Sequence, residues 1–316
     1  MINRIEVDTF YRPMGLGMSV PILVMGDDFE NYILKNENRD RLNFNCMFLN
    51  ELLAYQIGLY LGVPMPEAAI ANVSKLFVLK EPGVRFSYKV EPGLYFASKE
   101  LEGIENNLLD NIQELLQMGK KYANRTWSVF FNKIDNKEYI ANIIAFDILI
   151  SNFDRYSNEG NVLISAVNKR CIFAIDHGHA FGGPTWDVGK LQRMKSCFDE
   201  QNYIRAFVFN AKQCSGRIFR ALCQHIDLTE LDKNPFATVV DKIESISEEL
   251  IHTWLNNIPV EWFIDKKLQS QIYVNYILTQ KRLVRDIIQS MAENELFDNY
   301  LGGKLEWLKE YQLNTV

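Results

Sequence analysis

The segment NFDRYSNEGNVLIS, residues 152–165, is followed closely by FAIDHGHAF, residues 173–181, and these two segments decide the fold of the chain. The first passes from the end of an apolar helix through a polar loop into a short strand. The second is a strand that delivers Asp176 into an abrupt His-Gly-His break. Two such strands joined by a short polar turn predict a β-hairpin. The hairpin is therefore expected to bring Asp154, Asn161 and Asp176 to one end.

Two carboxylates and an amide oxygen at one end of a hairpin suit magnesium-dependent phosphoryl transfer. Asp154 can orient a substrate hydroxyl, while Asn161 and Asp176 can hold metal ions against phosphates. Asn158, in the same loop, is a competing candidate for the amide ligand. Taken singly, each of these residues is also explained as a turn residue that hydrogen-bonds to nearby backbone. It is their combination that indicates a site.

A lysine and a glutamate occur upstream in the order that a kinase-type site requires. Residues 32–35 read as a strand that ends in Lys35. The apolar pattern of residues 44–61 predicts an amphipathic helix, with Asn43 as its N-cap. Glu51 lies in the middle of this helix. It either faces solvent or pairs with Lys35, and such a pair holds the lysine against the α- and β-phosphates of a nucleotide.

A glycine-rich segment, GLGMS at residues 15–19, precedes the first apolar strand. Backbone amides next to glycines can approach phosphates closely, which makes Gly17 and Ser19 candidate nucleotide contacts. An ordinary turn is the alternative. The segment lacks the lysine of a Walker P-loop, so a P-loop fold is not indicated.

Other polar residues near the two segments have structural explanations. Asp147 lies inside an apolar helical run, where an unpaired carboxylate costs several kcal/mol, so we expect it to pair with a loop amide or with Arg155. His177 and His179 flank Gly178. Because two histidines on either side of a glycine rarely converge on one ion, packing or hydrogen bonding within the loop is expected.

The remaining pattern places strands in the first third of the chain and helices after it. Further strands are predicted over residues 19–26, 68–79 and 93–98. Helices are predicted over residues 108–118, 139–151, 202–224, 236–257, 266–293 and 303–312. A β-rich first third followed by a helical remainder indicates an α+β fold in two parts, residues 1–98 and 99–316.

Composition excludes several classes of function. The 316 residues carry a net charge of −6, which argues against broad electrostatic binding to nucleic acid or to anionic membranes. The five cysteines are odd in number and none forms a C-x-x-C pair, and only four histidines are present, so reduced thiols are expected rather than a zinc site. No signal peptide or membrane-spanning run is recognised, and the cytoplasm is the expected location.

Six segments of the chain resemble the HipA-like kinases, in particular the stand-alone bacterial HipA-like domains, and more distantly the phosphatidylinositol 3- and 4-kinases. They are YRPMGLGMSVPILV, NYILK, NELLAYQIGLYLGVPMPEAAI, GLYFAS, AFDILISNFDRYSNEGNVLI and FAIDHGHAF, within residues 11–181. The resemblance implies a bilobal protein-kinase-like fold, with a β-rich N-lobe and a mainly helical C-lobe, that uses ATP and magnesium.

The resemblance also implies roles for the residues that bind the nucleotide. Lys35 would contact the α- and β-phosphates and Glu51 would anchor it. Gly17 and Ser19 would lie in the phosphate-facing turn. Arg155 would order the catalytic loop or neutralise phosphate charge.

In the same comparison, Asp154 would be the catalytic aspartate, and Asn161 and Asp176 would ligate magnesium. Two departures from the family pattern D-R-H concern this loop. Tyr156 stands where the family has histidine, and the position five residues after Asp154, where the family has asparagine, holds Glu159. Asn161 therefore fits only with a two-residue insertion.

The function expected from the sequence is that of an ATP- and magnesium-dependent kinase acting on a hydroxyl group, with protein serine or threonine as the first acceptor. A nucleotide-binding pseudokinase or a partner-binding module of a multi-protein bacterial system is the first alternative. A small-molecule or lipid phosphotransferase is the second.

Overall fold

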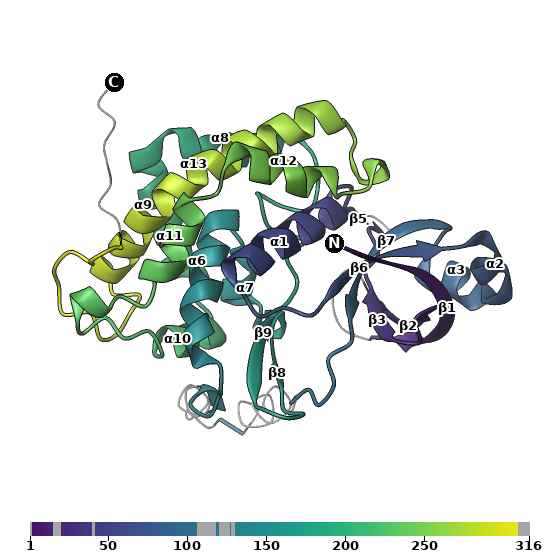
Figure 1. Cartoon of the computed structure of the whole chain (residues 1–316), viewed down its shortest axis with the longest axis horizontal. Coiled ribbons are helices and arrows are strands. Elements are labelled where there is room, and N and C mark those ends of the chain that lie inside the picture. The colour runs from purple at the N-terminus through teal and green to yellow at the C-terminus, as the bar shows by residue number, and fades with distance from the viewer. Residues whose placement is uncertain are drawn as a thin grey trace.

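A computed structural model of the chain describes residues 2–14, 20–39, 42–105, 118–119, 127 and 130–308. Strands occupy the N-terminal third and helices fill most of the remainder (Figure 1). This arrangement confirms the predicted α+β class, with a β-rich N-terminal region and a helical C-terminal region.

Five strands of the N-terminal region form a closed barrel in the order β1-β2-β3-β7-β6. Their bounds are β1 Asn3–Pro13, β2 Ile22–Gly26, β3 Asn31–Leu34, β6 Ala68–Val73 and β7 Gly93–Lys99. β1 pairs antiparallel with β2 and parallel with β6, and the parallel pairing closes the barrel. Buried apolar side chains such as Val24, Tyr32 and Leu34 form part of its core. A short ladder of β4, Asn38–Arg39, and β5, Leu42–Asn43, follows β3.

Helix α1, Met47–Leu61, lies between the barrel and the helices of the C-terminal region (Figure 1). Every residue of α1 except Leu59 and Tyr60 is buried, because neighbours cover it on all sides rather than along one stripe. Gly62 ends the helix in the left-handed conformation, at φ 75°.

The predicted N-cap of α1 at Asn43 is wrong, since the helix begins at Met47 and Cys46 takes the N-cap position. The Cys46 side chain makes no cap hydrogen bond. A carboxylate oxygen of Glu37 instead accepts a hydrogen bond from the backbone N–H of Phe48 at 2.7 Å, and this contact from the preceding segment stabilises the first turn.

The prediction of strands over residues 68–79 holds only as far as Val73. Ser74 then caps helix α2, Lys75–Lys80, by accepting the N–H of Phe77 at 3.0 Å. Helix α3, Pro82–Tyr88, follows directly and begins with a proline that favours its first turn.

The C-terminal region is built around helices α6 and α13. Helix α6, Ile140–Ile150, is buried at every position except Asn142, and α13, Lys266–Glu293, packs against it as the longest helix of the described chain. Around them lie α8 Val188–Lys195, α9 Glu200–Cys214, α10 Arg217–Cys223, α11 Ala237–Glu244 and α12 Glu248–Asn256. Short 3-10 turns are η1 Lys137–Tyr139, η3 Ser196–Phe198, η4 Leu231–Lys233 and η5 Val260–Trp262.

Two of the predicted helices are interrupted. The helix expected over 202–224 is broken at Gly216, whose N–H donates to the carbonyl of Tyr156 at 2.6 Å. The helix expected over 236–257 is broken before Ser247, which caps α12 by accepting the N–H of Leu250. In both cases the residue at the break makes a hydrogen bond that is not part of the regular helical pattern, and the helix does not continue through it.

The last predicted helix is also partly wrong, because residues 303–308 are not helical. Gly302 and Gly303 have positive φ angles of 96° and 106°, which a right-handed helix does not accommodate. The helix predicted over 108–118 falls almost entirely outside the described residues.

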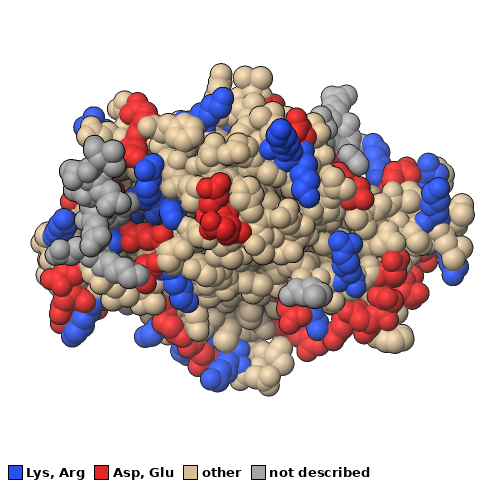
Figure 2. All heavy atoms as spheres, turned by 45° about the horizontal axis from the view of Figure 1, so that its top comes forward, with Lys and Arg blue, Asp and Glu red and all other residues tan. Residues whose placement is uncertain are grey.

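The surface has no single dominant charge on the face shown in Figure 2, where acidic and basic side chains are scattered with uncharged surface between them. Among the residues that the structure describes, none of the helices has the length and apolar character required to span a membrane.

Candidate functional site

Lys35 follows the last residue of β3, and its backbone N–H continues the pairing with β7 by donating to Phe96 at 3.1 Å. The side chain is almost buried and makes two ion pairs. Its Nζ donates to a carboxylate oxygen of Glu51 and, at 2.8 Å, to Oδ1 of Asp176. Burial alone would lower the pKa of Lys35, but the carboxylates of Asp176 and Glu51 outweigh it and raise that pKa above its ordinary value.

The predicted pairing of Glu51 with Lys35 is therefore present, and Glu51 does not face solvent. Its second oxygen accepts a hydrogen bond from the backbone N–H of His177 at 3.1 Å. Burial would raise the pKa of Glu51, but the Lys35 ammonium and the contact with His177 lower it, so the group is ionised. The buried carboxylate of Glu51, on α1, thus links Lys35, which follows β3, to His177, which follows Asp176.

Asp154 and Asn161 lie on the loop between α6 and the hairpin. Asp154 begins the short helix α7, Asp154–Ser157, and Asn161 ends the 3-10 turn η2, Glu159–Asn161. The amide Nδ2 of Asn161 donates to Oδ2 of Asp154 at 2.7 Å. The two predicted residues are in direct contact despite the longer loop.

Asn158 is directed elsewhere. Its exposed side chain accepts the N–H of Gly160 at 3.0 Å and caps η2. In this conformation Asn158 has the turn-forming role that is common for asparagine, whereas Asn161 is buried beside the catalytic candidate Asp154.

Arg155 is buried beneath this loop. Its Nε donates to Oδ2 of Asp147 at 2.8 Å, and its Nη1 donates to the carbonyls of Ile175, at 2.9 Å, and of Asn161. The predicted partner of Asp147 is therefore present. Burial raises the pKa of Asp147 to about 6 although the Arg155 guanidinium acts in the opposite direction. The described contacts of Arg155 are those of a residue that orders the loop.

The predicted hairpin consists of β8, Val162–Ser165, and β9, Cys171–Ala174. Beyond β9 the N–H of Ile175 donates to the carbonyl of Asn161 at 3.2 Å, so Asn161 and Asp176 lie at the same end, as expected. Asp176 adopts a positive φ of 60°, a conformation that aspartate tolerates better than most residues. Its side chain is 36% exposed.

The two histidines of the loop are packed. His177 is buried against the ring of Phe146 at 5.4 Å between ring centroids, and burial lowers its pKa. His179 meets Phe44 edge-on at 5.7 Å. These ring contacts agree with the packing alternative of the expectation for the two histidines.

The oxygen donors at this end of the hairpin fit a magnesium ion. Asn161 gives an amide hydrogen to Asp154, which leaves its Oδ1 as an acceptor, and Asp176 has one oxygen that Lys35 does not engage. Magnesium prefers such oxygen ligands and retains several waters, for which the partial exposure of Asp176 leaves access. Gly17 and Ser19 lie outside the described residues.

Two residues of the site region were not indicated by the sequence patterns, Glu37 and Asn50. Glu37 caps α1, and Asn50 precedes Glu51 on the same helix. A polar residue inside an otherwise apolar helix is a signal for Asn50, but the contacts that it makes are with distant segments and are not readable from local spacing.

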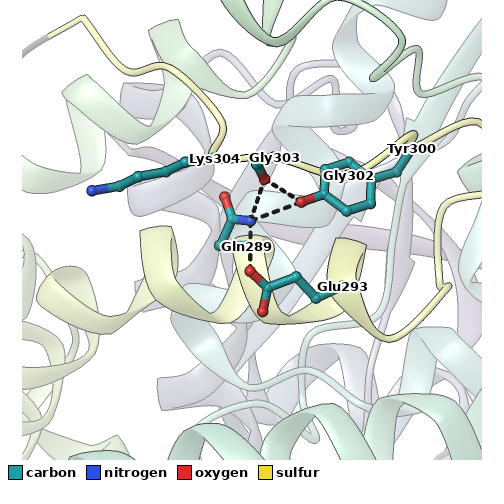
Figure 3. Close-up of a pocket in the computed structure, with 6 residues that line it drawn as sticks. All are labelled: Gln289, Glu293, Tyr300, Gly302, Gly303 and Lys304. Atoms are coloured by element: carbon teal, nitrogen blue, oxygen red, sulfur yellow. Dashed lines mark hydrogen bonds between the residues drawn. The ribbon is translucent and has the colours of Figure 1, made fainter.

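A hollow lies at the C-terminal end of α13, and none of the residues described above lines it. Figure 3 shows this hollow. It is lined by Gln289, Glu293, Tyr300, Gly302, Gly303 and Lys304. Gln289 donates to Glu293, Tyr300 and the carbonyl of Gly303, so its polar groups fasten the following loop to the helix.

Comparison with known structures identifies a similar fold. The crystal structure of a Helicobacter pylori proinflammatory kinase, CtkA, is similar with a TM-score of 0.52 and 16% sequence identity, covering 96% of this chain and 100% of that one. An aminoglycoside phosphotransferase from Alicyclobacillus acidocaldarius matches at a TM-score of 0.26 and 9% identity, over 91% and 93% of the two chains. A comparison with curated proteins gave no match.

The family is determined by a sequence match. The family model described as HipA-like kinase matches residues 7–198, more than half of the 316 residues, and this span includes Lys35, Glu51, Asp154 and Asp176. The chain therefore belongs to the HipA-like kinase family, and its enzyme class is that of a kinase.

Proposed function

We propose that this chain is an ATP- and magnesium-dependent kinase that transfers the γ-phosphate to a hydroxyl group, with protein serine or threonine as the first acceptor to test. The observation that carries the proposal is the connection of Lys35 to both Glu51 and Asp176, next to the Asp154–Asn161 pair. Kinases use a strand lysine, a helix glutamate and metal-binding residues in this order.

Each residue has a role in this scheme. Lys35 binds the α- and β-phosphates, and Glu51 holds the lysine in place. Asp154 orients the acceptor hydroxyl and takes up its proton, while Asn161 and Asp176 hold magnesium. When bound, magnesium would neutralise the negative charge of the phosphates.

Arg155 acts from beneath the site. Because its guanidinium bonds Asp147 and the carbonyls of Asn161 and Ile175, we assign it the ordering of the loop rather than contact with phosphate. In the same proposal, residues 1–98 form the N-lobe and residues 99–316 the C-lobe, and the enzyme works in the cytoplasm, where ATP and magnesium are supplied.

One observation favours a second candidate, a nucleotide-binding pseudokinase. Asn161 follows Asp154 by seven residues, and its amide engages a carboxylate oxygen that a catalytic aspartate needs for its substrate. If this bond persists when nucleotide binds, ATP would be held without efficient transfer.

The first test is the change in melting temperature on adding MgATP, measured for the parent, Lys35→Ala and Lys99→Ala. Lys99 is a matched control, because it is also a barrel lysine in an ion pair, with Glu30 at 2.9 Å. We expect a shift in the parent and in Lys99→Ala and none in Lys35→Ala. An equal shift in all three would exclude this assignment of Lys35.

Labelled ATP supplied with protein, lipid and small-metabolite pools then identifies the acceptor class. Asp154→Asn is expected to bind MgATP but to transfer phosphate roughly 100-fold or more slowly, the usual contribution of a positioned general base. Binding without transfer by the parent would support the pseudokinase instead.

A further inference from the structure

Asn50 is completely buried on α1, next to Glu51, and its amide contacts the segment that follows Asp176. Its Nδ2 donates to three backbone carbonyls of this segment, those of Gly178 at 2.7 Å, Ala180 at 3.1 Å and Gly183 at 3.0 Å. The two hydrogens of this amide are therefore shared among three carbonyls of a segment that has no regular secondary structure.

The oxygen of the same amide is held by two donors from other helices. Tyr273 of α13 donates its hydroxyl hydrogen to Oδ1 of Asn50 at 2.6 Å, and Lys190 of α8 donates from Nζ at 3.2 Å. Lys190 also donates to the carbonyl of Gly183 at 2.6 Å. Because Oδ1 faces two groups that act as donors to it, the Nδ2 group must face the carbonyls.

The segment after Asp176 also lies directly against α1. A Cβ atom added to Gly178 would be 2.5 Å from Cγ of Met47, so only glycine fits without displacement. Asp176 itself has a positive φ and needs support from its surroundings to stay in that conformation. The contacts of Asn50 supply that support two residues after Asp176.

We propose that Asn50 is a positioning residue for Asp176. By fastening residues 178–183 to α1, it fixes the carboxylate of Asp176 relative to the Lys35–Glu51 pair, so that α1 sets the positions of the lysine and of the metal-holding carboxylate together. This inference rests on the proposed function, which gives Asp176 its role toward magnesium.

A matched control exists on the same helix. Gln56 is also a buried amide of α1, but it donates to the carbonyl of Trp254 at 3.0 Å and accepts from Asn257 at 2.7 Å. It fastens α1 to the region of α12 instead of to the Asp176 segment. Asn50→Asp and Gln56→Glu are near-isosteric changes that each remove the amide donor from a buried contact.

The first measurement is hydrogen exchange of residues 177–183 in the absence of nucleotide. Amides in this segment are hydrogen-bonded, for example that of Phe181 to Ile150 at 2.7 Å. We expect exchange at least about tenfold faster in Asn50→Asp and unchanged in Gln56→Glu. Equal exchange in the two variants would overturn the proposal.

The second measurement is the magnesium concentration that gives half of the melting-temperature shift produced by ATP. We expect it to rise about 10–100-fold in Asn50→Asp, as for residues that orient metal ligands, and to change less than twofold in Gln56→Glu. A parent without any magnesium-dependent shift would refute the proposed function. A parent that shifts normally while both variants match it would refute the role of Asn50.

If the Asn50→Asp variant does not fold, Tyr273→Phe replaces it in both measurements. It removes only the hydroxyl that orients the amide. We expect a smaller increase in both exchange and magnesium requirement, in the same direction. If a folded Tyr273→Phe matches the parent in both measurements, the amide of Asn50 does not position Asp176.

Discussion

The ammonium of Lys35 forms ion pairs with two carboxylates from distant parts of the chain, those of Glu51 and Asp176. The single ammonium of Lys35 is shared between the side-chain carboxylates of Glu51 and Asp176, so acidic groups outnumber basic ones at this point. A nucleotide triphosphate adds further negative charge to the same place. Like charges repel at short range, so in the proposed function a divalent cation is expected to strengthen nucleotide binding.

From this charge balance we predict that ATP alone binds the parent at least about tenfold more weakly than MgATP, equivalent to about 1.4 kcal/mol. Asp176→Asn removes one carboxylate charge. It should bind free ATP more tightly than the parent does and lose most of the gain from magnesium. Calorimetric titration with and without magnesium measures both effects. A variant that keeps the parental magnesium gain would contradict the assignment of Asp176 as a metal ligand.

Burial raises the pKa of Glu37 from 4.5 to about 7. A carboxyl with a raised folded-state pKa stabilises the fold fully below its unfolded pKa, and this stabilisation is lost as the pH rises through about 7. The parent should therefore lose about 2–3 kcal/mol of unfolding free energy from this group between pH 4 and pH 9.

Glu37→Gln keeps an oxygen that can accept the N–H of Phe48 but cannot ionise. Its unfolding free energy should exceed that of the parent above pH 7 and approach it at acidic pH. Urea unfolding at several pH values gives the comparison. Asp147 also has a raised pKa, but it is present in both proteins and cancels in the difference. Parallel pH profiles would show that Glu37 does not titrate as described.

At the same scale, the sequence predicted those contacts that follow from residue type and order. Asp147 with Arg155 followed from a carboxylate in an apolar helical run that needs a partner. Lys35 with Glu51 was one of two alternatives for Glu51, and the order of the two residues suited a kinase-type site. The contacts of Asn50 and Glu37 were not predictable, because a neutral amide or an isolated carboxylate has many possible partners. Their actual partners depend on the packing of separate segments.

Among the helices and strands, single residues that interrupt an apolar pattern determine where one element ends and the next begins. Gly216 separates α9 from α10, and its N–H holds the carbonyl of Tyr156, in the helix that begins with Asp154. Apolar periodicity continues through this break, so it predicted one helix. The same holds for Ser74, where apolar residues suit a strand or a helix and only the cap decides.

We predict that Gly216→Ala lowers the unfolding free energy by about 1–3 kcal/mol and slows any phosphate transfer, because the new Cβ would lie 2.9 Å from the carbonyl oxygen of Tyr156. Gly83→Ala in α3 is the control. No atom lies within 4 Å of its added Cβ, and alanine favours the helix, so this variant should be neutral or slightly more stable. Urea unfolding separates the two, and equal stabilities would count against the role of the Gly216 contact.

At the scale of the whole molecule, α1 connects the barrel to the helices. Phe48 of α1 packs on Tyr95 of β7 and on Trp262, ring centroids 5.6 and 5.3 Å apart, and the indole N–H of Trp262 donates to the carbonyl of Leu94 at 3.1 Å. The β-rich and helical parts were predictable from composition along the chain. The parallel closure of the barrel was not, since β1 and β6 are far apart in sequence and strand pairing is not encoded locally.

The family match ends at residue 198, before the helices α12 and α13 that cover α1 and α6. We predict that a fragment of residues 1–198 does not fold on its own, because the apolar surfaces of α1 and α6 would be exposed to water. Circular dichroism melting and size-exclusion chromatography, with the full chain as control, test this. A monomeric fragment with a cooperative transition would contradict it.

The parallel pairing of β1 with β6 also has a consequence for synthesis of the chain. β1 ends at Pro13 and β6 at Val73, a separation of 73 − 13 = 60 residues. At about 5–20 residues per second, the ribosome needs roughly 3–12 s to make the strand that pairs with the open edge of β1. During this time one edge of the nascent sheet is open to pairing with another nascent chain. Slower translation is therefore expected to lengthen the exposure of this edge and to favour aggregation of nascent chains.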